Sequence, residues 1–363
     1  MSEKTLTKQD IEDLAVGAAI LGTGGGGDPY IGKLMAIQAL ERGRKIIVMD
    51  PEEVPDDAFV VPVAAMGTPT VLIEKIPSGK EALYALKLLE QYFNRESEYI
   101  TPIEAGGINS TIPLTVAAIK GKPVLDGDGM GRAFPELQMV TFHLYGVKAT
   151  PMSMADEKGN AVILDAIDNY WAEKIARVVT MRFGGTAWIA IYAMSGKKYK
   201  EAAVKGTVTL AIEIGRTLRE AKLHGINALD ALLDMTKGYL LFTGKIIDVN
   251  RQNIGGFARG EAVIEGLEDF KGSKLIIKFQ NENLVAVKNG KIIASVPDLI
   301  TVLDKETGKP ITTERLRYGL RVNVIGIPCD PKWRTSKGLK VVGPKYFGYY
   351  IEYKPIEKSV KEA

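Results

Sequence analysis

The segment from Pro123 to Gln138 constrains how this chain can fold more than any other. It follows an apolar run and places Asp126 and Asp128 at the end of an expected strand, before a glycine turn that leads to Arg132 and Glu136. Ligands of α/β proteins bind beyond the carboxyl ends of strands, where glycine lets the backbone come close. Short Asp-Gly segments often only cap neighbouring backbone. The added arginine and glutamate favour a functional site.

Chain length, net charge and the distribution of apolar residues limit the class of protein. A chain of 363 residues exceeds the usual size of a single core, so two domains are expected. With 47 basic and 44 acidic residues, the net charge of +3 gives no argument for nucleic-acid or membrane binding. No run of eighteen apolar residues and no signal-peptide pattern is present, which predicts a cytoplasmic protein.

Scarce cysteine and histidine limit the metal chemistry. The single cysteine, Cys329, excludes an intramolecular disulfide framework and a cysteine-based zinc site. The two histidines, His143 and His224, are too few for a histidine-rich centre. The sequence requires no cofactor, and a bound metal would be held mainly by carboxylates, which suits magnesium, manganese or calcium.

Hydrophobic patterns divide the chain in two. Strand and helix patterns alternate over residues 1–165, which predicts an α/β domain with a mostly parallel sheet. Residues 166–363 contain one or two helices and then short strands with turn signals, which predicts a β-rich, barrel-like or sandwich domain. Helices are expected near 11–21, 30–41, 79–93, 113–119, 207–223 and 228–236, and strands near 45–50, 59–65, 99–103, 122–125, 244–249, 275–279, 284–287, 292–295, 321–327 and 346–353.

Residues 22–27 contain five glycines and fit the dinucleotide-binding pattern G-x-G-x-x-G. That fingerprint follows a strand, whereas Thr7 and Asp10 form a capping-box pattern before a helical repeat that runs into this loop. We therefore expect the loop to join two helices, which disfavours a dinucleotide-dependent oxidoreductase. Its exposed backbone N–H groups still suit an anionic or carbonyl oxygen, with Gly24, Gly25, Gly26 and Asp28 as candidate substrate-binding residues.

Two further strand-end loops carry polar groups. Glu104, Gly106, Gly107 and Asn109 repeat the pattern of a carboxylate, two glycines and an amide after an apolar strand, and are candidates for substrate binding. Residues 66–70 form another such loop. Four loops at one edge of a sheet would surround a single crevice, which is the best argument from the residues for an enzyme.

The carboxylates after residue 125 suggest acid–base chemistry. A calcium loop of the EF-hand type starting at Asp126 would need an acidic ligand at position 137, which is leucine, so that interpretation fails. Asp126 and Asp128 could instead hold a divalent ion or act as acid and base, because neighbouring carboxylates raise one another's pKa. Glu136 and His143 are seven residues apart and would share one face of a helix beginning at Pro135.

In the second half, two charged residues are candidates for binding substrate. Arg182 lies next to a glycine pair and could clamp a carboxylate. Asp298 is flanked by apolar residues at a strand end, although a role in hairpin structure is the alternative.

Taken together, these motifs resemble the S-methyl thiohydantoin desulfurase-like family. The matching segments run in order along almost the whole chain: 22–29, 104–109, 126–139, 244–246, 279–282, 297–300 and 343–348. The resemblance implies an N-terminal α/β domain, a C-terminal β-barrel-like domain and an association with hydantoin metabolism. Some relatives are fused to, or accompany, hydantoinase and oxoprolinase-type subunits, and assigned members are described as removing sulfur from a thiohydantoin ring.

If the resemblance holds, the chemistry is hydrolytic: water adds to the ring carbon that bears sulfur, and a thiol or sulfide leaves. Asp126 or Asp128 would be the base and Glu136 or His143 the acid. Backbone N–H groups of residues 24–27 and 106–107, together with Arg132 or Arg182, would be the donors to the anionic ring atoms.

The alternative is a non-catalytic ligand-binding subunit or a partner of a hydantoinase-type enzyme. In either case the ligand is a small molecule, and a homo-oligomer is expected on general grounds.

Overall fold

The computed structural model describes residues 3–68, 71, 75 and 77–362. Within them, nine strands form a first sheet in the order β1-β2-β5-β4-β3-β9-β7-β8, with β10 also pairing with β3. The neighbours β2, β5, β4 and β3 run parallel, and antiparallel strands extend this group on both sides. The strands are β1 (Glu3–Thr5), β2 (Ile47–Met49), β3 (Phe59–Gly67), β4 (Tyr99–Thr101), β5 (Val124–Leu125), β7 (Met152–Ala155), β8 (Ala161–Leu164), β9 (Thr186–Ala190) and β10 (Met194–Ser195).

Helices cover this sheet. Helices α4, α5 and α7 pack against its strands, and α2 packs on α5. Strands β9 and β10 lie beyond residue 165, so the first sheet crosses the predicted domain boundary. The helices of this part are α1 (Lys8–Leu21), α2 (Tyr30–Glu41), α4 (Glu81–Phe93), α5 (Ile112–Lys120), α6 (Thr141–Leu144), α7 (Asn169–Arg182) and α8 (Gly196–Ala202).

The second sheet has seven antiparallel strands in the order β16-β15-β14-β13-β12-β18-β17. Register shifts mark bulges in β12, β15 and β16, which bend strands, and the sheet curls until β17 approaches β15. The α/β class with a β-rich, half-barrel second part is thereby confirmed. These strands are β12 (Tyr239–Ile254), β13 (Phe257–Gly266), β14 (Lys274–Gln280), β15 (Glu282–Lys288), β16 (Lys291–Ser295), β17 (Leu299–Asp304) and β18 (Arg321–Ile327).

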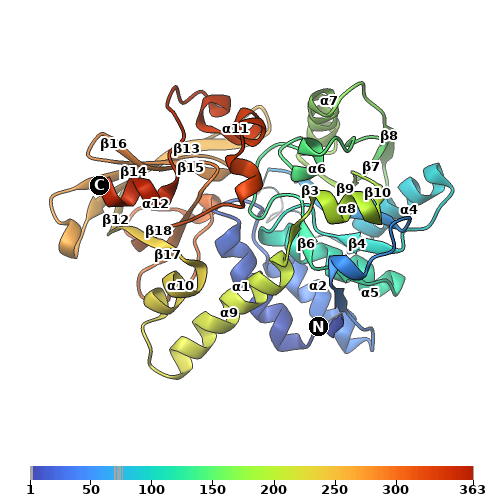
Figure 1. Ribbon diagram of the computed structural model, residues 1–363, viewed down its shortest axis with the longest axis horizontal. Helices are drawn as coiled ribbons and strands as arrows, with labels where there is room; N and C mark the ends of the chain where they lie inside the picture. The colour runs from blue at the N-terminus through green and yellow to red at the C-terminus, as the bar shows by residue number, and fades with distance from the viewer. Residues whose placement is uncertain (1–2, 69–70, 72–74, 76, 363) are drawn as a thin grey trace.

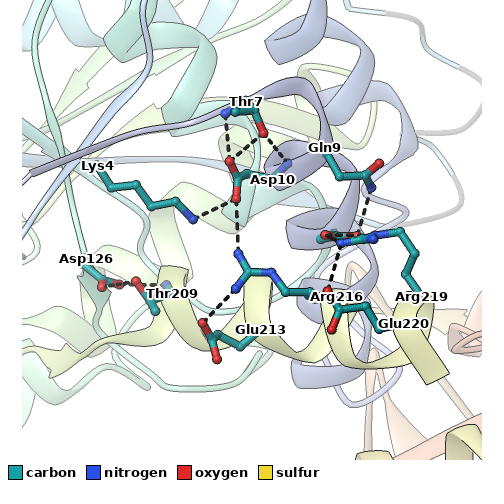
Figure 2. Close-up of polar contacts among 11 residues, drawn as sticks. Lys4, Thr7, Gln9, Asp10, Asp126, Thr209, Glu213, Arg216, Arg219 and Glu220 are labelled. Carbon is teal, nitrogen blue, oxygen red and sulfur yellow. Dashed lines mark hydrogen bonds and ion pairs between the residues drawn. The ribbon is translucent and has the colours of Figure 1, made fainter. Parts of the chain in front are cut away.

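Helix α1 lies between the two sheets and packs along α9 (Thr207–Leu223) (Figure 1). The helices touch through glycine, because a Cβ on Gly17 would lie 1.9 Å from the carbonyl oxygen of Ala211, and one on Gly215 equally close to that of Asp13. Beside this contact, Arg219 donates two hydrogen bonds of 2.9 Å to the carboxylate of Asp13 (Figure 2).

Most predicted elements are confirmed, including the helices that flank the glycine loop. Three predictions are wrong. Among the described residues, the range 166–363 contains six α-helices, whereas one or two were expected. Residues 346–353 form a 3-10 turn and irregular chain instead of a strand. No helix begins at Pro135, because side chains of α7 bind the backbone there: Arg177 donates to the Pro135 carbonyl at 3.0 Å, and the Leu137 N–H donates to Glu173 at 2.9 Å.

The helices of the described residues fall short of what a lipid bilayer demands of a membrane span. None combines enough length and apolar character to cross a membrane.

Asp298 ties the last part of the chain to the second sheet. Its fully buried carboxylate accepts hydrogen bonds from Arg334 (2.9 Å), the Cys329 N–H (3.0 Å), the Tyr353 hydroxyl (2.9 Å) and the Ile356 N–H (2.8 Å). The Asp298 carboxylate therefore holds four residues between 329 and 356 in place.

We expect Asp298→Ala to lower the free energy of unfolding by about 3 kcal/mol or more, because it leaves three donors without their acceptor and leaves the half-buried Arg334 with Glu357 as its remaining acceptor. Tyr353→Phe, which removes one of the four bonds, should cost about 1 kcal/mol. Urea denaturation measures both effects. Asp234→Ala is the control, since that side chain is 89% exposed, and a similar loss in all three variants would contradict this role for Asp298.

Candidate active site

A pocket opens where the carboxyl ends of β3 and β4 meet the β14–β15 hairpin of the second sheet. Parallel strands direct the loops that follow them to one edge of the sheet, and this edge is where ligands bind in α/β folds. The pocket encloses about 590 Å³, including its open mouth. Its walls are built by Gly26, Gly27, Ala64, Ala65, Met66, Gly67, Ile103, Glu104, Ile108, Asn109, Met130, Phe134, Pro135, Glu136, Leu137, Arg177, Ile189, Asn281 and Glu282. Of the strand-end loop at 66–70, Pro69 and Thr70 lie outside the described residues.

The glycine loop holds the hairpin against the first sheet. The Asn283 N–H donates to the Thr23 carbonyl and the Thr313 N–H to the Gly24 carbonyl, both at 2.8 Å. A Cβ on Gly25 would lie 1.9 Å from the Glu282 carboxyl, so only glycine leaves room for that side chain. The predicted loop thus binds the protein's own carboxyl group.

The glycines of the second predicted loop face the first loop. The Ile108 N–H donates to the Gly26 carbonyl at 2.9 Å, and a Cβ on Gly107 would lie 1.9 Å from the Gly27 carbonyl oxygen. A Cβ on Gly106 would press against Ala133. The structure therefore brings the loops at 24–27 and 104–109 together, as the sequence predicts.

Glu104 lies at the base of the pocket, fully enclosed, and is held by Asn109. The Asn109 amide donates to Glu104 at 2.7 Å and is itself fixed by two hydrogen bonds with the backbone of Ala65. Burial raises the pKa of Glu104 to about 8, while the bonds from Asn109 and the Phe134 N–H act in the opposite direction. At neutral pH this carboxyl is mainly protonated and can change its charge near physiological pH.

Glu282 is the second buried carboxyl of the pocket. Burial, followed by the nearby charge of Glu104, raises its pKa well above the ordinary value, although Arg132 and the Gly26 N–H favour its ionised form. Its Oε2 atom has no hydrogen-bond partner among the described residues. A buried polar atom without a partner costs free energy, so this oxygen is suited to a ligand.

Arg132 is completely buried next to both carboxyls. It donates to the carbonyls of Pro297 and Asp298, each at 2.9 Å, and its guanidinium lies 4.4 Å from the Phe134 ring centroid. Burial lowers its pKa to about 10, which leaves it charged at neutral pH. One arginine thus lies near two carboxyls of raised pKa, and such a pair can act as acid and base.

The outer wall of the pocket carries a third carboxyl. Glu136 accepts hydrogen bonds from the Tyr346 hydroxyl at 2.6 Å and from Gln138 at 2.5 Å. Tyr346 comes from the C-terminal part of the chain, so this contact joins the two halves beside the pocket. Glu136 was predicted as a catalytic acid, and the structure places it in the pocket lining, where it is less buried than Glu104 and Glu282.

Asp126 and Asp128 do not line the pocket. Asp126 accepts hydrogen bonds from the N–H and hydroxyl of Thr209, at 3.0 and 2.6 Å, and so caps the start of α9 (Figure 2). Asp128 binds the N–H groups of Met130 and Gly131 and the side chain of Thr207, and burial raises its pKa to about 7. Both carboxyls act on the turn and on α9, which is the capping alternative of the sequence analysis.

Arg132, Gly24, Gly25, Gly106 and Gly107 are also outside the pocket lining. Four further predicted residues lie outside it as well. His143 is half-buried, with its ring nitrogen 3.0 Å from the Asn169 amide, and burial lowers its pKa. Asp28 forms an ion pair with Arg315 and caps the backbone at Tyr30. Arg182 is exposed at the end of α7, and Asp298 holds the residues described above. None of these side chains meets the Glu104–Glu282 pair.

Sequence reasoning did not assign Glu282 or Arg177 to the site. Glu282 lies in segment 279–282, which the sequence marks only as one of the segments that carry the family resemblance. Arg177 lies in α7 without any motif, and it reaches the pocket because the helix packs beside Pro135. Nothing local in the sequence marks such a contact.

Among the described residues, no group of three or more histidine, cysteine, aspartate or glutamate side chains is arranged to hold a metal ion.

Two family models match this chain. The model of the S-Me-THD-like N-terminal domain matches residues 9–166, and that of the S-Me-THD-like C-terminal domain matches residues 167–356. The chain belongs to the S-Me-THD-like family. The resemblance seen in the motifs, to S-methyl thiohydantoin desulfurase-like proteins, is thereby confirmed.

A solved structure supports the fold of this family member. The crystal structure of a protein from Chromobacterium violaceum matches with a TM-score of 0.79 and 26% sequence identity, over 97% of this chain and all of that one. The comparison with curated proteins found no match.

The raised pKa of Glu104 predicts how stability depends on pH. The folded state binds the Glu104 proton more tightly than the unfolded state does, so this contribution is complete below pH 4.5 and is lost as the pH rises toward 8. Relative to Glu104→Gln, the wild type should therefore lose up to about 1.4 kcal/mol of unfolding free energy per pH unit in this range.

Urea denaturation of both proteins at several pH values between 5 and 8 measures this difference. Glu306→Gln, on an exposed side chain, is the control and should differ from the wild type by a constant amount. A constant difference for Glu104→Gln as well would contradict the raised pKa.

Proposed function

We propose that this protein hydrolyses a thiohydantoin-like cyclic amide, replacing a sulfur substituent on the ring with oxygen. Two features support the proposal. The family name refers to thiohydantoin desulfurase-like proteins, and the pocket holds two enclosed carboxyls of raised pKa beside one arginine. The carboxyl pair is the observation that carries the proposal, because hydrolysis of such a ring needs both a base and an acid.

We assign Glu104 as the base and Glu282 as the acid. Hydrogen bonds from Asn109 and the Phe134 N–H favour the ionised form of Glu104. Glu282 keeps an oxygen without a partner, which as a protonated group can donate to the substrate. Arg132 positions and stabilises the pair and does not line the pocket.

In an S-methylated thiohydantoin, the water oxygen bonds to the ring carbon that carries sulfur while Glu104 takes one water proton. The carbon–sulfur bond then breaks, and methanethiol leaves. Overall, one proton of the water ends on the ring nitrogen and the other on the thiol, while the oxygen becomes a ring carbonyl. Glu104 and Glu282 relay these protons and are regenerated. Apolar side chains such as Met66, Met130 and Phe134 limit the water around the reacting ring.

The two alternatives are a dinucleotide-dependent oxidoreductase and a non-catalytic binding subunit. A dinucleotide fingerprint requires a strand before its glycines, and here the loop follows helix α1, while Gly25 and Gly26 contact Glu282. A non-catalytic subunit would bind the ring without turning it over, and the assay below distinguishes that outcome.

The direct test is incubation of the purified chain with an S-methylated thiohydantoin, measuring methanethiol with a thiol reagent and hydantoin by chromatography. We expect turnover in the wild type and a fall in kcat of about 10²–10⁴-fold in Glu104→Gln and in Glu282→Gln, because each removes a proton-transfer group. Both substitutions keep the size of the side chain.

Asp126→Asn is the matched control, because Asp126 lies at the start of α9, and its variant should keep most of the activity. Loss of turnover in Asp126→Asn with full activity in Glu104→Gln would instead support the base predicted from the sequence. Binding of the ring without turnover in the wild type would support the non-catalytic subunit.

A second prediction concerns the pH dependence of catalysis. Glu104 has a pKa of about 8 and must lose its proton to act as a base, so kcat/KM should rise as the pH increases from 6 toward 8. A pH–rate profile of the wild type measures this rise. A profile that is flat across this range would contradict the assignment of Glu104.

A further inference from the structure

The outer face of α7 exposes an unusual number of apolar side chains. Val178 is 62% exposed, Met181 52% and Trp171 47%, and Ile167, just before the helix, is 80% exposed. Contiguous apolar surface of this kind marks an interaction site more often than a free surface. Figure 1 places α7 at the periphery of the molecule.

These side chains follow the period of the helix. Trp171, Ile175, Val178 and Arg182 are spaced by four, three and four residues, so they form one stripe along the surface. Lys174 lies within the same face, with its ammonium group 4.7 Å from the centroid of the Trp171 ring. From Trp171 to Arg182 the stripe is about 17 Å long.

The two ends of the stripe carry opposite charges. Asp165 and Asp168 lie at its beginning, and Arg182 lies at its end. No described side chain forms an ion pair with Arg182 or with either aspartate, although Asp168 caps the Trp171 N–H and Asp165 accepts a hydrogen bond from Thr150. A surface with an acidic end, an apolar middle and a basic end is complementary to itself when a second copy is turned end for end.

We propose that α7 forms the centre of a two-fold interface between two copies of this chain. An axis near Ile175 lies midway between Asp168 and Arg182, and almost midway between Trp171 and Val178. Each Trp171 then packs against Val178 of the other copy, and each Asp168 faces the other copy's Arg182. Such an isologous contact uses one patch twice, as most homodimers do.

The inner face of the same helix supports the pocket. Glu173 binds the Leu137 N–H, and Arg177 binds the Pro135 carbonyl, so α7 holds one wall of the site in place. A partner on the outer face would restrict movement of this helix from the other side. The interface itself does not depend on the proposed reaction, and its test measures mass rather than turnover.

The experiment is light scattering of the full chain after size-exclusion chromatography, over a range of protein concentrations. We expect the wild type to have twice the 39.5 kDa mass of one chain and Val178→Asp to have the mass of one chain. The dissociation constant should rise at least 100-fold, because the substitution buries two unpaired carboxylates. Leu223→Asp, on an apolar side chain that is 70% exposed at the end of α9, is the matched control and should remain dimeric.

The charge pattern gives a second test. At low salt, Arg182→Asp should weaken the dimer about tenfold by placing like charges at both ends of the stripe. Asp168→Ser retains a capping oxygen for α7 while removing the charge, so adding it to Arg182→Asp should restore part of the affinity. Equal dissociation constants for all of these proteins would overturn the predicted orientation.

Cross-linking tests the interface with surface cysteines, so its result does not depend on a charge substitution that disturbs the fold. In a Cys329→Ser background, Ile175→Cys should be linked to its copy by a short bis-maleimide, since packed helices lie about 8–10 Å apart, whereas Leu223→Cys should not. A wild type with the mass of one chain at every concentration would overturn the proposal. So would a Val178→Asp protein that keeps the wild-type mass.

Discussion

The close approach of three backbone segments at the pocket is the constraint on which the rest of the structure depends. The loop at 22–27, the turn at 106–107 and the tip of the β14–β15 hairpin leave no room for a Cβ at Gly25, Gly26 or Gly107. Gly25 leaves room for Glu282 of the second sheet, and Gly26 and Gly107 let the two loops of the first part pack together. The hydrogen bonds from Asn283 and Thr313 to the loop then fix the two halves relative to each other.

The packing of the two halves against each other also brings together the charged groups of the site. Glu104 comes from the first sheet and Glu282 from the second, so the carboxyl pair exists only when the halves are packed together. Their burial raises both pKa values, and the enclosed Arg132 limits the cost of holding them there. The same contact that stabilises the fold therefore produces groups that can exchange protons near neutral pH.

Local patterns predicted most of the elements, because caps and periodic apolar residues act over short distances. The helices before and after the glycine loop are examples. The helix expected at Pro135 failed because Glu173 and Arg177, some forty residues later, bind the backbone of that segment. A contact between residues so far apart in the chain outweighs local helix propensity, and it produces no periodic pattern in the sequence of either segment.

By itself, the sequence determined the class of fold, the family and the loops that surround the pocket. Glycine turns and carboxylates at strand ends can be recognised from the neighbouring residues alone. Only the tertiary structure decided which carboxyls enter the pocket. Asp126 and Asp128 are drawn to the start of α9, where helix N–H groups and threonine hydroxyls need acceptors. Glu282 enters instead, because the curled second sheet carries its hairpin to the glycine loop, and that placement depends on packing across more than 250 residues of chain.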